Sequence, residues 1–141
     1  MEKSRIVNTR GAIDWRSDCP ICSALDVLGD KWTMLIVRDL IVHGPRTYSQ
    51  LLAAPEAIST NILADRLTLL TSLRLIERIS PQNPARNNAF RLTESGAALR
   101  PVLQGLGRWA HMHLKDFHQA ILAIPDDPNA GRRTLDLRSP T

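Results

Sequence analysis

The stretch 47-TYSQLLAAPEAISTNILADRLTLL-70 decides the fold. Thr47 and Gln50 have the spacing of a capping box, which predicts a helix over 48–54 that Pro55 ends. The next three residues are expected to form a tight turn, and Ser59 then caps a second helix. Two helices joined by a tight turn are a candidate helix-turn-helix.

The second of these helices, expected over about 59–74, has two different faces. Leu63, Leu67 and Leu70 recur at helical spacing and are predicted to face the core. The opposite face carries side chains short enough to bring the helix close to base edges in a DNA groove. These residues are Thr60, Asn61, Ala64, Asp65 and Thr68.

An extended pattern follows this helix. Residues 76–80 and 89–92 have the alternation of two strands, and the proline-, asparagine- and arginine-rich residues between them predict a hairpin with a basic tip. A helix-turn-helix followed by such a hairpin, or wing, is the layout of a winged helix. The expected fold class is therefore mainly α with a small β-hairpin wing, and DNA binding is the leading functional hypothesis.

The predicted DNA-contacting set combines the recognition helix at about 59–74 with the wing at about 76–92. The Ser59 hydroxyl and the free N–H groups of the first turn are expected to hold a phosphate. The set comprises Thr47, Ser59, Thr60, Asn61, Ala64, Asp65, Arg66, Thr68, Arg86, Asn87 and Asn88.

Two helices are expected before this motif. Pro20 is suited to a first helical position, and Ile21, Leu25 and Leu28 give that helix an apolar stripe that Gly29 ends. Asp30 is the predicted N-cap of the next helix, which is expected to end at 43–44 with His and Gly.

A long helix is expected from Thr93 onward. Pro101 should kink it or split it in two, because proline lacks the N–H that a helix interior requires. Its predicted apolar stripe is too long for one domain to cover, so part of it should face a partner subunit. The stripe comprises Leu99, Leu103, Leu106, Ala110, Leu114 and Phe117.

The length of 141 residues indicates one domain with extensions. We expect an N-terminal arm at 1–17, a domain at 18–118 and a flexible tail at 119–141. Of the net charge of +4, +3 lies between residues 59 and 100, which is also compatible with an ordinary solvated face. No secretory signal or membrane span is recognised, so the predicted location is the cytoplasm.

Cys19 and Cys22 frame the motif CPIC, which allows three interpretations. With Pro20 at the first helical position, Cys19 lies at the N-terminus of a helix, where the dipole favours a reactive thiolate. Packing as small apolar residues is the alternative that the residues themselves favour. A zinc site is disfavoured because His111 and His113 point to opposite sides of a helix, and no metal or cofactor is predicted.

Three segments together resemble the HxlR-type winged helix-turn-helix transcriptional regulators. They are "CPI…AL…LGDKW…LI.RDL..G..TYSQLL", "IS…L..RL..L…LIER" and "FRLTESG…L.PVL..L..W", and the resemblance runs from about Cys19 to Trp109. The matching positions include Lys31 and Trp32 after the first helix, Ile58 and Ser59 at the recognition helix, and Thr93, Glu94 and Gly96 after the wing.

The resemblance implies a homodimer, held by the amino- and carboxy-terminal helices, that represses or activates from an inverted-repeat operator. It also implies sensing of oxidants or electrophiles through Cys19. Two features depart from the family pattern. Asp65 places a negative charge on the outward side of the recognition helix, and the wing tip has Arg86 as its main cation.

Other functional classes have less support. The chain has no glycine-rich phosphate loop and no nucleophile paired with a base, so no enzyme is predicted. Trp15, Trp32 and Trp109 are interpreted as core and interface residues, with a small-molecule effector pocket as the alternative. A dimerisation or adaptor module that does not bind DNA is the runner-up function, because fold does not determine function.

Overall fold

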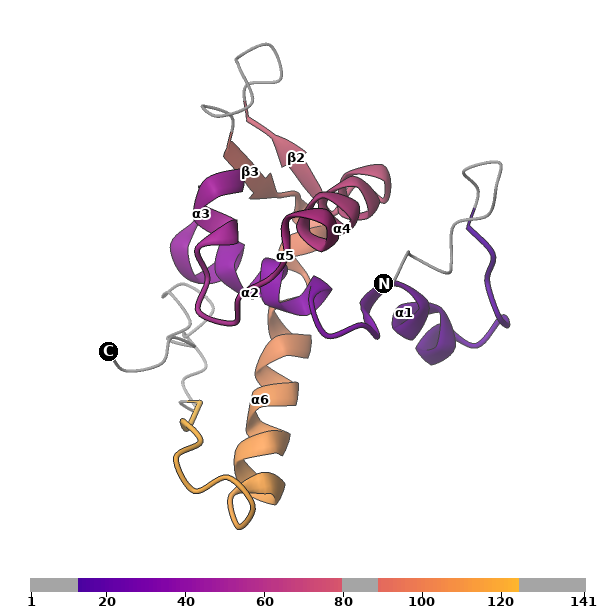
Figure 1. Ribbon diagram of the computed structural model, residues 1–141. Helices are drawn as coiled ribbons and strands as arrows, with labels where there is room; N and C mark the ends of the chain where they lie inside the picture. Colours follow the sequence, from indigo (N-terminus) through magenta and orange to yellow (C-terminus); the bar gives the residue numbers. More distant parts are fainter. Residues whose placement is uncertain (1–12, 80–88, 125–141) are drawn as a thin grey trace.

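The computed structural model describes residues 13–79 and 89–124 and contains the expected winged helix-turn-helix. In Figure 1, α6 projects from one side of the fold and the strands β2 and β3 lie at the opposite side. The elements are α1 (Pro20–Leu28), α2 (Thr33–His43), β1 (Arg46–Thr47), α3 (Tyr48–Leu52), α4 (Thr60–Ser72), β2 (Ile76–Arg78), β3 (Ala89–Leu92), α5 (Glu94–Ala97) and α6 (Arg100–Leu114).

The sheet has three antiparallel strands in the order β1-β3-β2. Ile76 pairs with Leu92 in the β2–β3 hairpin, as the sequence pattern predicts. Strand β1 was not predicted; it pairs Arg46 with Phe90 on the other side of β3. Two residues are too few to show an alternating pattern, so only tertiary pairing defines this strand.

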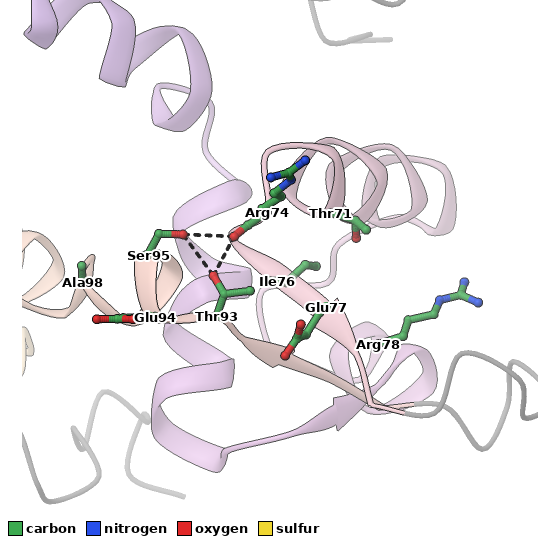
Figure 2. Close-up of a pocket in the computed structure, with 9 residues that line it drawn as sticks. All are labelled: Thr71, Arg74, Ile76, Glu77, Arg78, Thr93, Glu94, Ser95 and Ala98. Carbon is green, nitrogen blue, oxygen red and sulfur yellow. Dashed lines mark hydrogen bonds between the residues drawn. The ribbon is translucent and has the colours of Figure 1, made fainter.

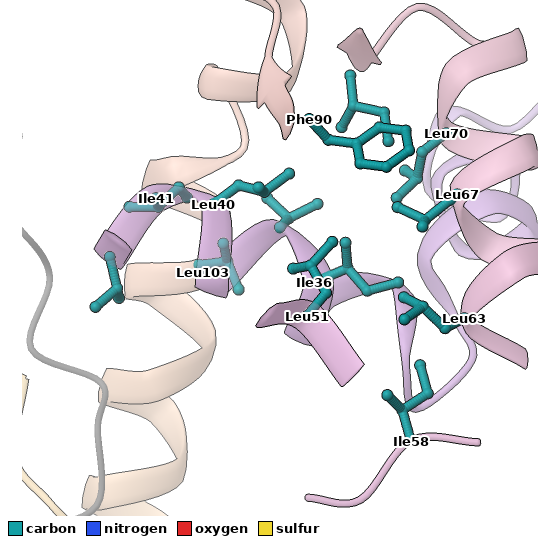
Figure 3. Close-up of a cluster of buried hydrophobic side chains, with 13 residues drawn as sticks. Ile36, Leu40, Ile41, Leu51, Ile58, Leu63, Leu67, Leu70, Phe90 and Leu103 are labelled. Carbon is teal, nitrogen blue, oxygen red and sulfur yellow. The ribbon is translucent and has the colours of Figure 1, made fainter. Parts of the chain in front are cut away.

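The core lies where α2 meets α4, the sheet and the start of α6. Val37, Leu63, Leu70 and Ile76 are fully buried, and Leu103 is the residue through which α6 joins the buried cluster. Figure 3 shows side chains of α2 lying between those of α4 and Leu103. The predicted core face of α4 is therefore confirmed.

Local capping signals place the helix-turn-helix as expected. The Thr47 hydroxyl accepts the N–H of Gln50 at 3.2 Å, and the Gln50 side chain accepts the N–H of Thr47 at 2.9 Å. The Ser59 hydroxyl accepts the N–H of Ile62 at 3.3 Å and begins α4. Helix α3 ends at Leu52, two residues earlier than predicted, and α4 ends at Ser72.

The start of α2 differs from the prediction. Trp32, rather than Asp30, is the N-cap, and the helix begins at Thr33. The Asp30 carboxylate still satisfies N-terminal donors, because Oδ2 accepts the N–H groups of Trp32 and Thr33, each at 3.0 Å. Gly44 ends the helix with a φ of 74°, a conformation that favours glycine.

The predicted C-terminal helix is split in two. Pro101 lies in the first turn of α6, and Thr93 caps the short α5 by accepting the N–H of Gly96 at 3.2 Å. Helix α6 ends at Leu114, so Phe117 is not part of the helix and is 87% exposed.

The residues after α6 fold back toward the core. Ile124 packs against the buried cluster, and a Cβ atom at Gly107 would lie only 1.8 Å from the Ile124 Cδ1 atom. A side chain at position 107 would therefore require the Ile124 side chain to shift. Residues 125–141, like 1–12, lie outside the described residues. Within the described ranges, no helix has the length and apolar composition needed to cross a membrane.

Candidate nucleic-acid interface

The outward face of α4 carries the polar residues that the sequence predicts. Thr60, Asn61, Ala64 and Thr68 are exposed, while Leu63 and Leu67 on the other side are buried. The Thr68 hydroxyl donates to the Ala64 carbonyl at 2.9 Å, which leaves its oxygen available as an acceptor. The face is thus a short-side-chain surface with donors and acceptors near the N-terminus of the helix.

Tyr48 of α3 fixes the start of α4. Its hydroxyl donates to the Thr60 carbonyl at 2.8 Å, joining the first residues of the two helices. This contact was not predicted from the sequence. Tyr48 directly follows the cap Thr47, but its acceptor is a backbone carbonyl that leaves no signal in the sequence.

Arg38 of α2 fixes the turn between α3 and α4. Its guanidinium donates two hydrogen bonds to the Glu56 carboxylate, at 2.8 and 2.7 Å, and also bonds Asp39. These hydrogen bonds lower the pKa of the Glu56 carboxyl from its ordinary value, and they outweigh the opposite effect of its partial burial. A bidentate pair also restricts geometry, so the turn is held to α2.

Arg66 does not belong to the exposed surface, contrary to the prediction. It is 4% exposed, and its Nε lies 3.0 Å from Oδ2 of Asp30. Its Nη1 donates to Oδ2 of Asp65 at 3.1 Å. Buried arginines require charged partners, and here both carboxylates supply them. Asp65 is half-buried and shares Arg66 with Asp30 as its ion-pair partner.

The wing contributes two strands whose tip lies outside the described residues. The predicted DNA contacts of the wing lie within 80–88, outside the described residues, and so remain predictions. They are Arg86, Asn87 and Asn88. On the described strands, Arg78 is exposed, with its guanidinium carbon 5.4 Å from the centre of the Phe90 ring. Arg91 pairs with Glu77 at 2.9 Å. Arg78 was not among the residues predicted to contact DNA.

An open hollow of about 920 Å³ lies beside β2, at the base of the wing. Arg74 borders it with a φ of 59°, and the Arg74 carbonyl accepts the hydroxyls of Thr93 at 2.6 Å and Ser95 at 3.0 Å. Figure 2 shows these two hydroxyls converging on that carbonyl. The hollow is lined by Thr71, Arg74, Ile76, Glu77, Arg78, Thr93, Glu94, Ser95 and Ala98.

The thiols of the CPIC motif lie at the start of α1. Cys19 is the N-cap residue, as predicted, and is exposed, while Cys22 one turn later is half-buried. Both are free cysteines. Cys19 is therefore accessible to a reagent in this chain, and it does not pack as a core residue here.

Apolar side chains of α1 and α6 are exposed in the single chain. On α1, Ile21 and Leu25 face outward, and none of its residues is buried. Of the predicted stripe on α6, Leu103 is buried and Leu106 is exposed, so the single chain covers the stripe only in part, as expected. The exposed apolar side chains of α6 are Val102, Leu106, Trp109, Met112 and Leu114.

The three tryptophans have different environments. Trp32 packs against the buried cluster, with the Lys31 Nζ 5.0 Å from its ring centre. Trp15 is about half exposed, as is Trp109, which lies against the His113 ring at a centroid distance of 5.6 Å. Among the described residues, no three His, Cys, Asp or Glu side chains are grouped in a way that could hold a metal ion.

Comparison with known proteins identifies the family of the chain. Residues 27–118 match the model of the HxlR-like helix-turn-helix family. The transcriptional regulator YodB of Bacillus subtilis is 34% identical over 94 residues, covering 65% of this chain and 82% of YodB.

Solved structures show the same fold. PA1607 superposes with a TM-score of 0.66 at 27% identity, covering 88% of this chain and 86% of PA1607. Reduced YodB of B. subtilis superposes with a TM-score of 0.58 at 31% identity, covering 71% of this chain and 98% of YodB. YodB has also been solved bound to quinone and after treatment with diamide.

The family match covers the helix-turn-helix with α4, the strands of the wing and α6. The winged helix-turn-helix is thus both the geometry of the chain and the fold of its relatives. This protein belongs to the HxlR-like helix-turn-helix family of transcriptional regulators.

Proposed function

We propose that the protein binds duplex DNA in a sequence-specific manner, with α4 in the major groove and the wing at about 76–92 on adjacent DNA. The observation that carries this proposal is the exposed face of α4. Asn61 has the amide that pairs with adenine edges, and Thr60, Ala64 and Thr68 have methyl groups suited to thymine. All four are short, so the helix backbone can approach the bases.

The surroundings of α4 supply contacts to the phosphate backbone. Ser59 and Thr47 cap the two helices of the motif, and the first-turn N–H groups of α4 are suited to an anion. Arg78 on β2 and Arg86 at the wing tip are the cations expected on flanking DNA. Asp65, which would repel phosphate, is paired with Arg66 instead.

The proposed assembly is a homodimer formed by α1 and α6. Exposed apolar side chains on both helices, including Leu25 and Leu106, favour burial against a second copy. A two-fold dimer presents two α4 helices to an inverted-repeat operator, with half-sites about one helical turn apart.

Cys19 is the proposed sensor of oxidants or electrophiles, the predicted effector class. It is exposed at the start of α1, the helix assigned to the dimer interface, and the related YodB has been solved with quinone and after diamide. A Cys19 thiolate would add to a quinone ring carbon, and the ring would take up a proton to become a hydroquinone thioether. Such an adduct would add bulk where two subunits meet.

The sensor proposal predicts a cysteine-specific response. Diamide or a quinone should lower operator affinity of the wild type, which is the behaviour of a repressor that releases DNA. Cys19→Ser should bind DNA normally and lose the response, while the matched Cys22→Ser should keep it. Operator affinity measured by fluorescence anisotropy before and after oxidant tests this, with mass spectrometry to locate the adduct. An unmodified Cys19 in protein that still responds would refute the assignment.

Selection of bound fragments from the source genome, followed by salt titration, tests DNA binding itself. A regulator enriches a discrete inverted repeat and loses affinity steeply as salt rises. An adaptor module that reuses the fold would enrich no sequence. The latter result would refute the proposed function.

A further inference from the structure

The contact between Asp30 and Arg66 joins two parts of the fold that are distant in the sequence. Asp30 follows the C-cap of α1 by one residue, and Arg66 lies in the middle of α4. The Arg66 Nε is 3.0 Å from the Asp30 Oδ2. The side chains are 5% exposed for Arg66 and 15% exposed for Asp30, so solvent screens the contact only weakly.

Asp30 is held rigidly at its own end of the contact. Its carboxylate accepts the backbone N–H groups of Trp32 and Thr33, and the Thr33 hydroxyl donates to Oδ1. Thr33 is itself fully buried. Because three donors fix this carboxylate, it acts as a stationary charge against which Arg66 is placed.

The burial of Arg66 depends on the negative charge of Asp30. A buried guanidinium without a carboxylate is strongly destabilising, and its other partner, Asp65, is its neighbour on the same helix. The Arg66 Nε–H has no well-aligned acceptor among the described residues, so the attraction to Asp30 is mainly one of charge. Asp30 is therefore the partner that can fix α4 relative to the rest of the fold.

The position of Arg66 on α4 makes this restraint relevant to DNA. Arg66 is two residues from both Ala64 and Thr68 on the exposed face. A small rotation or shift of α4 at Arg66 moves those side chains together with Asn61. A hydrogen bond to a base requires its geometry to be correct within a few tenths of an ångström. Such a shift would therefore weaken contacts to bases more than contacts to phosphates.

We propose that Asp30 and Arg66 are positioning residues that set the orientation of the recognition helix from the α1–α2 corner. The proposal rests on the proposed DNA-binding function and deepens it, because α1 also carries Cys19. Only Gly29 separates α1 from Asp30, so a displacement of α1 by a partner or an adduct reaches α4 through this ion pair.

The test compares binding of operator and random duplexes by the full-length protein over a range of salt concentrations. Asp30→Asn keeps an oxygen for the N–H groups of Trp32 and Thr33 but removes the charge opposite Arg66. We expect it to lower the operator-to-random affinity ratio by about 3- to 30-fold. The salt slope should not change, since neither residue contacts phosphate.

Asp26→Asn is the matched control. Asp26 lies in α1, its side chain is 2% exposed, and it pairs with Arg16 rather than with any residue of α4. The same chemical change there should leave the affinity ratio as in the wild type. An equal loss of selectivity in both variants would overturn the proposal, because it would indicate a general effect of altering α1.

A double-mutant cycle tests whether Asp30 acts through Arg66 or whether the two residues act independently. If Asp30 acts through Arg66, then Asp30→Asn combined with Arg66→Met should be no less selective than Arg66→Met alone. Additive losses would overturn the proposal. So would a salt slope reduced by about one in Arg66→Met, which is the mark of a lost phosphate contact.

The same data distinguish this inference from the proposed function. Wild-type protein that shows no preference for any duplex would refute DNA recognition itself. Wild-type protein that is selective, together with an Asp30→Asn variant of unchanged selectivity, would refute only the positioning role.

Discussion

Helices α4 and α6 each have an apolar face and a more polar face. The chain buries the apolar face of α4, but it buries that of α6 only in part. The apolar side of α4 is buried by α2 and the sheet. Tyr48 fixes its start, the Arg38–Glu56 pair fixes the turn before it, and Asp30 contacts its middle. Helix α6 buries Leu103 near its start but leaves Leu106 and Trp109 exposed. The comparison indicates that one chain fixes the position of α4, whereas it leaves part of the apolar face of α6 exposed.

The difference has a physical origin. An exposed apolar patch is unfavourable by roughly 25 cal/mol per Å², which favours burial of the exposed side chains of α1 and α6 against another apolar surface. The outward face of α4 has few apolar atoms and is stable in water. It can therefore remain exposed in the free protein.

The largest expected effect comes from charging the α6 face. Leu106→Glu should convert dimers to monomers, because a buried unpaired carboxylate at the subunit interface is strongly unfavourable. Losing simultaneous binding to two half-sites should lower operator affinity by about 100-fold or more. Analytical ultracentrifugation measures the mass of the protein in solution, and fluorescence anisotropy measures its operator affinity.

Gln104→Glu is the control for that experiment, because it adds the same charge on nearly the opposite side of α6 from Leu106. It should stay dimeric and bind DNA. A dimeric, DNA-binding Leu106→Glu variant would place the interface elsewhere.

The next effect tests the exposed face of α4. Asn61→Ala should lose discrimination of the preferred site by about 1 to 3 kcal/mol, since an amide that pairs with a base edge is removed. Arg86→Ala should weaken all duplexes alike and flatten the salt slope by about one. Equal effects of both variants on operator and random DNA would contradict the division into a reading helix and a backbone-binding wing.

The sequence was sufficient where the determining interactions are local. Thr47, Ser59 and Pro101 act on residues within one helical turn, so the helix-turn-helix and the break before α6 could be predicted from spacing. The Leu63/Leu67/Leu70 face was equally clear, because helical periodicity needs no knowledge of the partner that covers it.

The sequence was insufficient where a partner lies far along the chain. Arg66 was predicted to lie on the DNA-contacting surface, but it is buried beside Asp30, which is 36 positions earlier in the chain. Strand β1 depends on pairing with β3, more than 40 positions later, and Arg38 meets Glu56 across 18. Periodicity and capping carry no information about such contacts.

A smaller effect is expected at the end of α4, where Arg74 has the left-handed conformation. That conformation costs an L-residue about 1 to 2 kcal/mol, and glycine avoids this cost while losing more chain entropy on folding. Arg74→Gly should therefore raise the free energy of unfolding by about 0.5 to 1 kcal/mol in a urea titration. Ser72→Gly, two residues earlier within the helix, should lower it by a similar amount. A destabilised Arg74→Gly variant would show that the arginine side chain matters more than its backbone.

The smallest effect concerns the turn that precedes α4. Hydrogen bonds from Arg38 lower the pKa of Glu56 in the folded protein, so folding favours the ionised carboxylate. The stabilisation is present above the pKa of the unfolded carboxyl and is lost as the pH falls through the lower, folded value. Because the Glu56 side chain is 35% exposed, its contribution should be about 1 kcal/mol or less. Glu56→Gln should be less stable than the wild type near pH 7, and this difference should shrink as the solution is acidified below about pH 4.5. Urea unfolding at several pH values measures the difference, and one that stays constant down to strongly acidic pH would show that Arg38 does not fix the turn through charge.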